Sequence, residues 1–161
     1  MSLASIFPFH KLVVAAFLPT TLLMACGTSL DSDDTIPQSQ VPQIVQSAFA
    51  SKYPGKTPQW ESQPYGYEAV FFKNGTEYEA EFSNSGQWLE TEYEVSSDNQ
   101  FSDAVLKSVR TQYLGYTITK REIEITPVGT FYEVEVENGS NEIELYFDNR
   151  GNQVNNSNED A

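Results

Sequence analysis

The chain has 161 residues, of which 23 are acidic and nine are basic, and its formal net charge is −14. This length is enough to bury one hydrophobic core without disulfides or metal ions, so we expect one domain with accessory segments. A surface this acidic repels polyanions, and we therefore expect no nucleic-acid partner.

Residues 1–25 have the pattern of a secretory signal peptide rather than of a membrane-spanning helix. The basic pair His10 and Lys11 is followed by the apolar run LVVAAFLPTTLLMA, and the segment holds no acidic residue. No later segment is apolar enough to span a bilayer. The sequence therefore predicts an exported protein.

The only cysteine follows this segment, and Leu23-Met24-Ala25-Cys26 resembles the lipobox of bacterial lipoproteins. In that family the signal is cut before the cysteine, the thiol receives a diacylglycerol and the new amino terminus is acylated, for example with palmitate. Several acyl chains give stable anchoring. Gly27 resembles the second residue of lipoproteins that pass to the outer membrane. The resemblance implies a lipid-anchored envelope protein that faces the periplasm or the cell surface; an ordinary signal peptide with an incidental cysteine is the alternative.

Loss of residues 1–25 would change the chemistry that is available. It removes the only histidine and Lys11, which leaves eight basic against 23 acidic residues and a formal charge of −15. Such a chain cannot build a Ser-His-Asp or Cys-His nucleophile pair, or a metal site with histidine or free cysteine ligands. We therefore expect a protein that is not an enzyme and that has no cofactor and no metal centre.

Residues 26–38 are polar, acidic and poor in large apolar side chains, which predicts a flexible tether before a domain at 39–155. Asp34-Thr35-Ile36 resembles the acceptor of an O-glycosylation system in some anaerobic Gram-negative bacteria, so Thr35 is a candidate glycosylation site. The acidic run is also compatible with a surface-export signal or a plain linker. A short polar tail is expected at 156–161.

The domain contains an internal repeat. VPQIVQSAFASKYPGKT (41–57) lines up with FSDAVLKSVRTQYLGYT (101–117), and YEAEFSNSGQWL (78–89) lines up with IELYFDNRGNQV (143–154). Self-similarity of this kind indicates that one structural unit occurs twice. We predict a tandem duplication with repeats at 39–97 and 98–155.

Each repeat is expected to open with a helix. In the first, Pro42 suits an early helical position, Pro54-Gly55 ends the helix, and the apolar stripe comprises Val41, Ile44, Val45, Ala48 and Phe49. In the second, Ser102 or Asp103 can cap, Gly115 ends the helix, and the stripe comprises Val105, Leu106, Val109 and Tyr113.

After each helix the apolar period changes from 3.6 to two. Glutamates alternate with apolar residues in TEYEAEF (76–82), WLETEYEV (88–95), YEVEVE (132–137) and EIELYF (142–147), with turn sequences at Asn74-Gly75, Asn84-Ser85-Gly86 and Asn138-Gly139. Such segments are half-buried antiparallel strands. The predicted fold class is α+β: two tandem helix-plus-antiparallel-meander repeats form one two-layer domain, with the helices on the apolar face and the glutamates on a bare face.

The order Val41-Pro42, helix, Tyr53-Pro54-Gly55 and the strand pattern of 67–90, repeated at 132–154, resemble the PepSY-like lipoproteins and periplasmic proteins of Gram-negative bacteria. The resemblance covers about residues 39–155. It implies a two-layer α+β fold similar to that of β-lactamase-inhibitory protein, and by analogy inhibition or protein binding. It supplies no catalytic residue.

The exposed sheet face is the candidate site. By alternation, Trp88, Phe131 and Tyr146 lie on the same side as the glutamates, although a one-residue slip in register would bury Trp88 instead. We expect a docking surface for an envelope protein or a cationic peptide, formed by these aromatic residues with Glu77, Glu79, Glu81, Glu133 and Glu135. The alternatives are a solvated face of a structural lipoprotein, loose binding of divalent cations, and a small envelope hydrolase that uses paired carboxylates.

Overall fold

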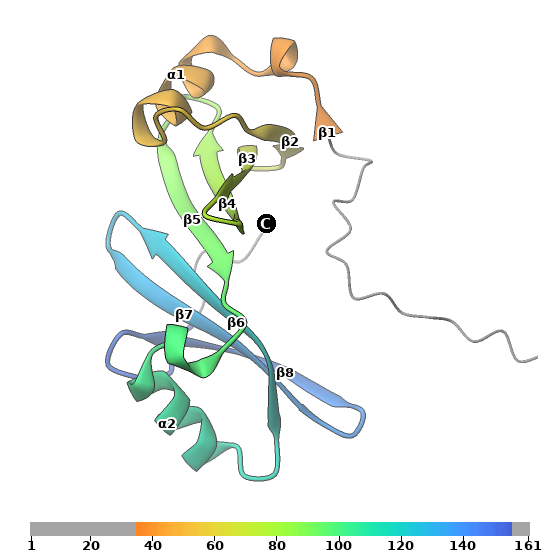
Figure 1. Ribbon diagram of the computed structural model, residues 1–161, viewed down its shortest axis with the longest axis vertical. Helices are drawn as coiled ribbons and strands as arrows, with labels where there is room; N and C mark the ends of the chain where they lie inside the picture. The colour runs from red at the N-terminus through yellow and green to blue at the C-terminus, as the bar shows by residue number, and fades with distance from the viewer. Residues whose placement is uncertain (1–34, 156–161) are drawn as a thin grey trace, which may run out of the picture. The chain divides into compact units, whose positions relative to one another are not determined.

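The computed structural model describes residues 35–155, which form two α-helices and one eight-stranded antiparallel sheet (Figure 1). The strands lie in the sheet in their sequence order. The helices are α1 (Gln43–Lys52) and α2 (Asp103–Gln112), and the strands are β1 (Thr35–Ile36), β2 (Gln59–Gln63), β3 (Gly66–Lys73), β4 (Thr76–Ser83), β5 (Trp88–Glu94), β6 (Thr117–Thr126), β7 (Gly129–Asn138) and β8 (Asn141–Asp148).

The predicted α+β fold with two helix-then-meander units is confirmed. Helix α1 precedes β2–β5, and helix α2 precedes β6–β8. The two meanders join where β5 pairs with β6, from Thr91 opposite Ile125 to Glu94 opposite Glu122. Each helix lies beside strands of its own repeat in Figure 1.

The first repeat has an aromatic core. Helix α1 buries Val45 and Phe49, and the ring of Phe49 lies 5.3 Å from that of Phe71 and 5.5 Å from that of Trp60, between centroids. Ile44, which was predicted on the buried stripe, is 58% exposed. Val41, Val45 and Phe49 follow one another at four-residue spacing, so a single row of side chains faces the sheet, and Ile44 is turned about 100° away from Val45.

The second repeat has a mainly aliphatic core. Helix α2 buries Val105, Leu106 and Val109 against strand residues that include Val134, Val136, Leu145 and Phe147. Its amino end is capped by Ser102, whose Oγ accepts a hydrogen bond from the backbone amide of Val105 (3.5 Å). This cap is one of the two that the sequence predicts.

Two bulges interrupt the strand alternation. In β5, Leu89 and Glu90 together lie opposite Glu81, because Ala80 pairs with Thr91 and Phe82 pairs with Trp88. In β6, Thr119 is the extra residue between Ile118 and Lys120. Each bulge moves the side chains on one side of it to the opposite face of the sheet.

The sheet begins within the segment that was expected to be a tether. Thr35 pairs with Glu61 and Ile36 pairs with Trp60, so β1 extends the sheet before residue 39. The expected signal peptide, Cys26 and the tail at 156–161 lie outside the described residues. Among residues 35–155, no helix has the length and hydrophobicity required to cross a membrane.

Candidate functional site

The sheet face opposite the two helices carries rows of glutamates, which we call the glutamate face. Eight directly opposed glutamate pairs lie across neighbouring strands: Glu61 and Glu68, Glu68 and Glu81, Glu79 and Glu92, Glu92 and Glu124, Glu94 and Glu122, Glu122 and Glu133, Glu135 and Glu144, and Glu137 and Glu142. Directly opposed side chains have Cβ atoms about 5 Å apart, and like charges at that separation repel. The antiparallel register therefore concentrates negative charge on this face.

The glutamate face is not bare, which differs from the prediction. The carboxylate-bearing residues Glu81 and Glu124 are only 7% and 4% exposed, and Glu90 in the β5 bulge is 3% exposed. A residue on an inner strand has neighbours on both flanking strands, and long glutamate side chains cover one another there. Hydrophobic alternation identifies the face but does not show how far neighbouring polar side chains bury each other.

Burial and mutual repulsion change the protonation of this face. Burial, reinforced by the carboxylates of Glu122 and Glu144, raises the pKa of Glu133 to about 8. Burial also raises the pKa of Glu79, and Glu122 and Glu77 add to the effect. Part of the glutamate face therefore holds protons at pH values at which an exposed glutamate is ionised.

Lys120 is a basic side chain among these carboxylates. Its Nζ lies 2.8 Å from Oε2 of Glu122. Burial lowers the pKa of Lys120, but the surrounding carboxylates of Glu122, Glu133 and Glu92 outweigh burial and hold that pKa above its usual range. A single ammonium group cannot balance the glutamates around it, so the face keeps a net negative charge. The sequence signal that could have identified Lys120 is the alternation of Lys120, Glu122 and Glu124 along β6.

Two of the three predicted aromatic residues lie on this face. Phe131 and Tyr146 stack with ring centroids 5.3 Å apart and an interplanar angle of 13°. Phe131 lies opposite Glu124, and the Tyr146 hydroxyl donates a hydrogen bond to the Glu124 carboxylate. Phe131 is half-buried, whereas Tyr146 is buried. The exposed part of this pair is therefore mainly the Phe131 ring.

The orientation predicted for Trp88 is wrong. The β5 bulge pairs Trp88 with Phe82, so its ring packs on the helix side at the border of the first core. Its Nε1 donates to Oγ1 of Thr91 (2.9 Å), and Nζ of Lys52 lies 3.1 Å from the ring centroid. Trp88 is thus held by a hydrogen bond and a cation–π contact within the domain.

The predicted glutamates are distributed across the whole sheet rather than gathered at one point. Glu77, Glu79 and Glu81 lie along β4, whereas Glu133 and Glu135 lie along β7. Strands β5 and β6 lie between β4 and β7 in the sheet. Glu79 and Glu133 are linked by Glu122, whose charge raises the pKa of both. The centre of the face is therefore the group Glu79, Glu122 and Glu133 with Lys120.

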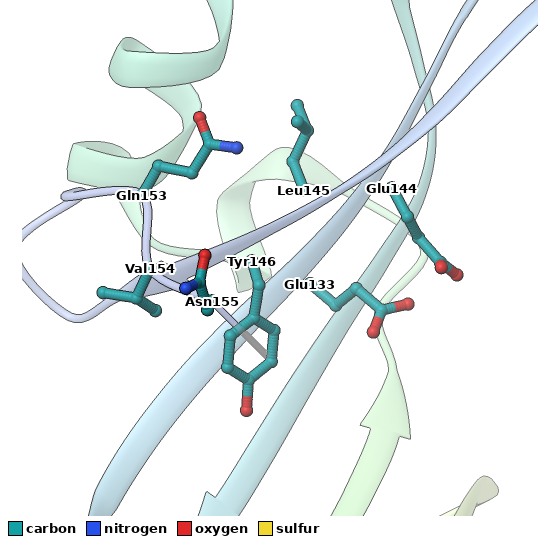
Figure 2. A pocket seen from close by; sticks show the side chains of 7 residues that line it. All are labelled: Glu133, Glu144, Leu145, Tyr146, Gln153, Val154 and Asn155. Carbon is teal, nitrogen blue, oxygen red and sulfur yellow. The ribbon is translucent and has the colours of Figure 1, made fainter. Parts of the chain in front are cut away.

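A pocket of about 300 Å³ lies at the β8 end of the glutamate face (Figure 2). Two carboxylates, the Tyr146 ring and the chain that follows β8 form its wall. The lining residues are Glu133, Glu144, Leu145, Tyr146, Gln153, Val154 and Asn155.

One acidic group has the spacing of a cation site. The carboxylate oxygens of Glu135, Glu137 and Glu142 lie within 4.8 Å of one another near the β7–β8 turn. Glu137 and Glu142 are exposed, and exposed carboxylates of this kind are commonly solvated by water alone. Thr35, the candidate glycosylation residue, is exposed in β1, and its Oγ1 accepts a hydrogen bond from Nε2 of Gln59 (3.2 Å).

Comparison with known proteins found one matching family model and several solved structures. The model is described as "Putative beta-lactamase-inhibitor-like, PepSY-like" and matches residues 30–69 and 65–154. No curated protein matches the sequence.

Three of the similar solved structures come from Bacteroides species. A BLIP-like protein from Bacteroides fragilis is 30% identical, with a TM-score of 0.65, and the alignment covers 74% of this chain and 85% of that one. A DUF2874 family protein from Bacteroides uniformis is 21% identical, with a TM-score of 0.66 and coverage of 71% and 86%. A Bacteroides eggerthii structure described as "putative periplasmic proteins" is 17% identical, with a TM-score of 0.65 and coverage of 71% and 86%. The last two similarities concern the fold alone.

Proposed function

Because the chain belongs to the PepSY-like, beta-lactamase-inhibitor-like family, we propose that it is a non-catalytic binding or inhibitory module that docks on another envelope protein through the glutamate face. The observation that carries the proposal is the group of opposed, partly buried glutamates around a single lysine. The partner is expected to present a basic surface or a cationic segment.

The opposed glutamates of the glutamate face destabilise the folded protein when no partner is bound. Each directly opposed like-charge pair destabilises a sheet by roughly 0.2 to 1 kcal/mol, and burial of a carboxylate adds to that cost. A basic partner would convert this repulsion into attraction and would lower the pKa of Glu79 and Glu133 toward the ordinary range. A cationic partner would therefore stabilise the glutamate face more than solvent does.

The stacked aromatic pair adds an apolar anchor to this charged surround. Phe131 is half-buried beside Glu124, and its ring is supported from below by Tyr146. A rigid aromatic ring that needs little further ordering is a frequent centre of a protein interface. We propose Phe131 as the apolar anchor of the docking surface and the glutamates around it as its charged rim.

The proposed location is the outer membrane, where the lipid-anchored domain faces the periplasm or the cell surface. Cys26, within its lipobox-like sequence, would carry the acyl chains, and residues 27–34 would connect the anchor to the sheet at Thr35. Thr35 is accessible for glycosylation in this arrangement.

A crosslinking pull-down from native envelope extract tests the function. The full chain serves as bait beside the double variant Glu79→Gln/Phe131→Ser, and a matched control carries Asp103→Asn/Leu114→Ser. The control also removes one charge and one apolar side chain, at exposed positions of α2 and of the loop after it. We expect the same protein to be captured by the parent and the control and to be reduced at least tenfold with the glutamate-face variant.

The outcome also separates this function from its alternatives. Equal capture by all three baits would contradict docking through the glutamate face. A hydrolase that depends on paired carboxylates would lose its activity abruptly with one Glu→Gln substitution, whereas a docking surface weakens stepwise as charges are removed. A purely structural lipoprotein would capture no partner with any of the baits.

A further inference from the structure

The outer edge of β8 is paired along only part of its length. The chain that follows β8 folds back on it: the amide of Asp148 donates to the carbonyl of Asn152 (3.0 Å), and the amide of Val154 donates to the carbonyl of Tyr146 (2.8 Å). Phe147 and Gln153 form a bridge between these bonds. Within residues 35–155, no strand pairs with this edge of β8 from Asn141 to Leu145.

The open part of the edge presents backbone groups in a fixed direction. The amide and carbonyl of one strand residue point to the same side, and that side alternates along the strand. Since the Tyr146 carbonyl and the Asp148 amide face the outer edge, the peptide groups of Glu144 and Glu142 face it as well. Five residues of strand span about 16 Å, enough for a short extended segment to pair.

The pocket lies where the returning chain leaves this edge. Gln153, Val154 and Asn155 form one wall, and Glu133 and Glu144 form another. The side chains of Glu133 and Glu144 extend toward the same side in Figure 2, and the charge of Glu144 contributes to the raised pKa of Glu133. None of the seven lining residues is basic.

We propose that the open edge of β8 and this pocket form one site for an extended, basic segment of a partner protein, which adds to the sheet as a further strand and places a lysine side chain between Glu133 and Glu144. Strand addition supplies affinity through main-chain hydrogen bonds, and the side-chain pocket supplies specificity. This inference rests on the proposed function, which gives the kind of partner as an envelope protein. It adds that the segment of the partner that binds is extended and basic.

Charge complementarity selects this occupant over a second copy of the chain. A second β8 edge would bring Glu142 and Glu144 against identical acidic side chains, and both copies carry a large net negative charge. Like-charge juxtaposition of this kind disfavours pairing, whereas an alternating lysine segment would place ammonium groups beside the carboxylates. The acidic edge thus disfavours self-association, and the backbone groups of β8 remain available to pair with a basic strand.

Binding of a synthetic peptide tests the inference. The probe is fluorescein-labelled Lys-Val-Lys-Val-Lys with blocked ends, titrated into the full chain in non-ionic detergent at 0.15 M salt and followed by fluorescence anisotropy. Two further peptides carry backbone N-methyl groups, one on both valines and the other on the second and third lysines. An added strand turns only one of these two sets of amides toward β8. We expect one methylated peptide to bind at least tenfold more weakly than the parent and the other to bind within threefold of it.

Protein variants provide an independent comparison. Glu144→Pro removes an amide that faces outward, which an edge strand tolerates because that amide makes no bond to β7. Glu144→Gln keeps the amide and removes the charge. We expect Glu144→Pro to weaken binding at least tenfold, Glu144→Gln to weaken it several-fold, and the control Asp103→Asn to leave it within twofold. If Glu144→Pro fails to fold, the two methylated peptides still decide the question.

Three results would overturn the inference: no saturable binding of the parent peptide, equal binding of the two methylated peptides, or a Glu144→Pro variant that folds and binds normally. The first two would leave general charge attraction as the only source of any binding. These results are separable from failure of the proposed function, because that function is tested with the natural partner and with Glu79 and Phe131, which do not line the pocket.

Discussion

At the scale of single residues, Glu133 links the stability of the fold to pH. Its folded pKa of about 8 lies above the value of 4.5 for an exposed glutamate, mainly because the side chain is partly buried and lies near Glu122 and Glu144. A raised carboxyl pKa means that the folded state prefers the protonated form. The stabilisation relative to the ionised form is complete below pH 4.5 and is lost as the pH rises through about 8.

The substitution Glu133→Gln should therefore stabilise the protein in alkaline solution. Glutamine resembles the protonated carboxyl in size and carries no charge, so the repulsion from Glu122 and Glu144 disappears. After allowance for solvent screening, we expect the free energy of unfolding to rise by about 1 to 2 kcal/mol at pH 8.5 and to be nearly unchanged at pH 4.5. Urea unfolding at the two pH values measures the difference.

Glu137→Gln is the matched control for that experiment, because Glu137 lies on the same strand but is exposed. Its effect should stay within about 0.5 kcal/mol at both pH values. A Glu133→Gln variant that is less stable than the parent at pH 8.5 would contradict this prediction, because the attraction between the ionised Glu133 carboxylate and Lys120 would then outweigh the repulsion from Glu122 and Glu144.

At the scale of elements, the β5 bulge holds one extra residue between Trp88 and Thr91. Deletion of Leu89 would remove the extra residue, so Glu90 alone would lie opposite Glu81 while Trp88 stays opposite Phe82 and Thr91 stays opposite Ala80. The Trp88 ring would therefore remain on the helix side and keep its contact with Lys52. We expect a loss of stability of about 0.5 to 3 kcal/mol, from the lost contacts of the half-buried Leu89 side chain.

Tryptophan fluorescence can report the position of the ring, provided that Trp60 is first replaced by phenylalanine so that Trp88 is the remaining indole. The deletion should leave the emission wavelength unchanged, since the ring stays packed on the helix side. Leu89→Ala keeps the number of residues in the bulge and should give the same emission. A shift to longer wavelength in the deletion variant alone would contradict this assignment, because it would mean that the strand changes register and carries the ring to the glutamate face.

The helices and strands were largely predictable from the sequence, because the spacing of the apolar residues changes from a 3.6-residue period to a two-residue period after each helix. Both helices and the strands around the glutamates lie where that period places them. Trp88 was misplaced because a bulge inserts a residue without a distinctive sequence signal. The burial of Glu81 and Glu124 was missed because it arises from neighbours on other strands, and a pattern within one strand does not contain that information.

The site was less predictable than the fold for the same reason. Phe131, Tyr146 and the glutamates of β4 and β7 were assigned to the correct face by alternation. Lys120 and Glu122, which lie at its centre, became important only through the pairing of β6 with β5 and β7. The pocket beside β8 depends on the returning chain at Gln153–Asn155, whose course no periodicity predicts.

At the scale of the whole molecule, the proposed lipid anchor depends on one side chain. Cys26→Ser removes the thiol that would receive the diacylglycerol, so the chain should move from the detergent-rich to the aqueous phase in Triton X-114 partitioning, and incorporation of labelled palmitate should cease. Thr28→Ala, two residues later, is the control and should behave as the parent does. Retention of label by Cys26→Ser would place the acyl chain elsewhere or show that there is none.

The order of the strands also has a consequence for how the chain folds. Every strand of the sheet pairs with its neighbour in the sequence, and only the β1–β2 and β5–β6 pairings have to close over a helix. Short closures cost little chain entropy, and folds dominated by local pairing form quickly. A chain that emerges from a ribosome or a translocation channel with its amino end first can complete α1 and β2–β5 before residue 117 appears. The half-finished sheet then ends in β5, whose free edge is the template on which the second repeat assembles.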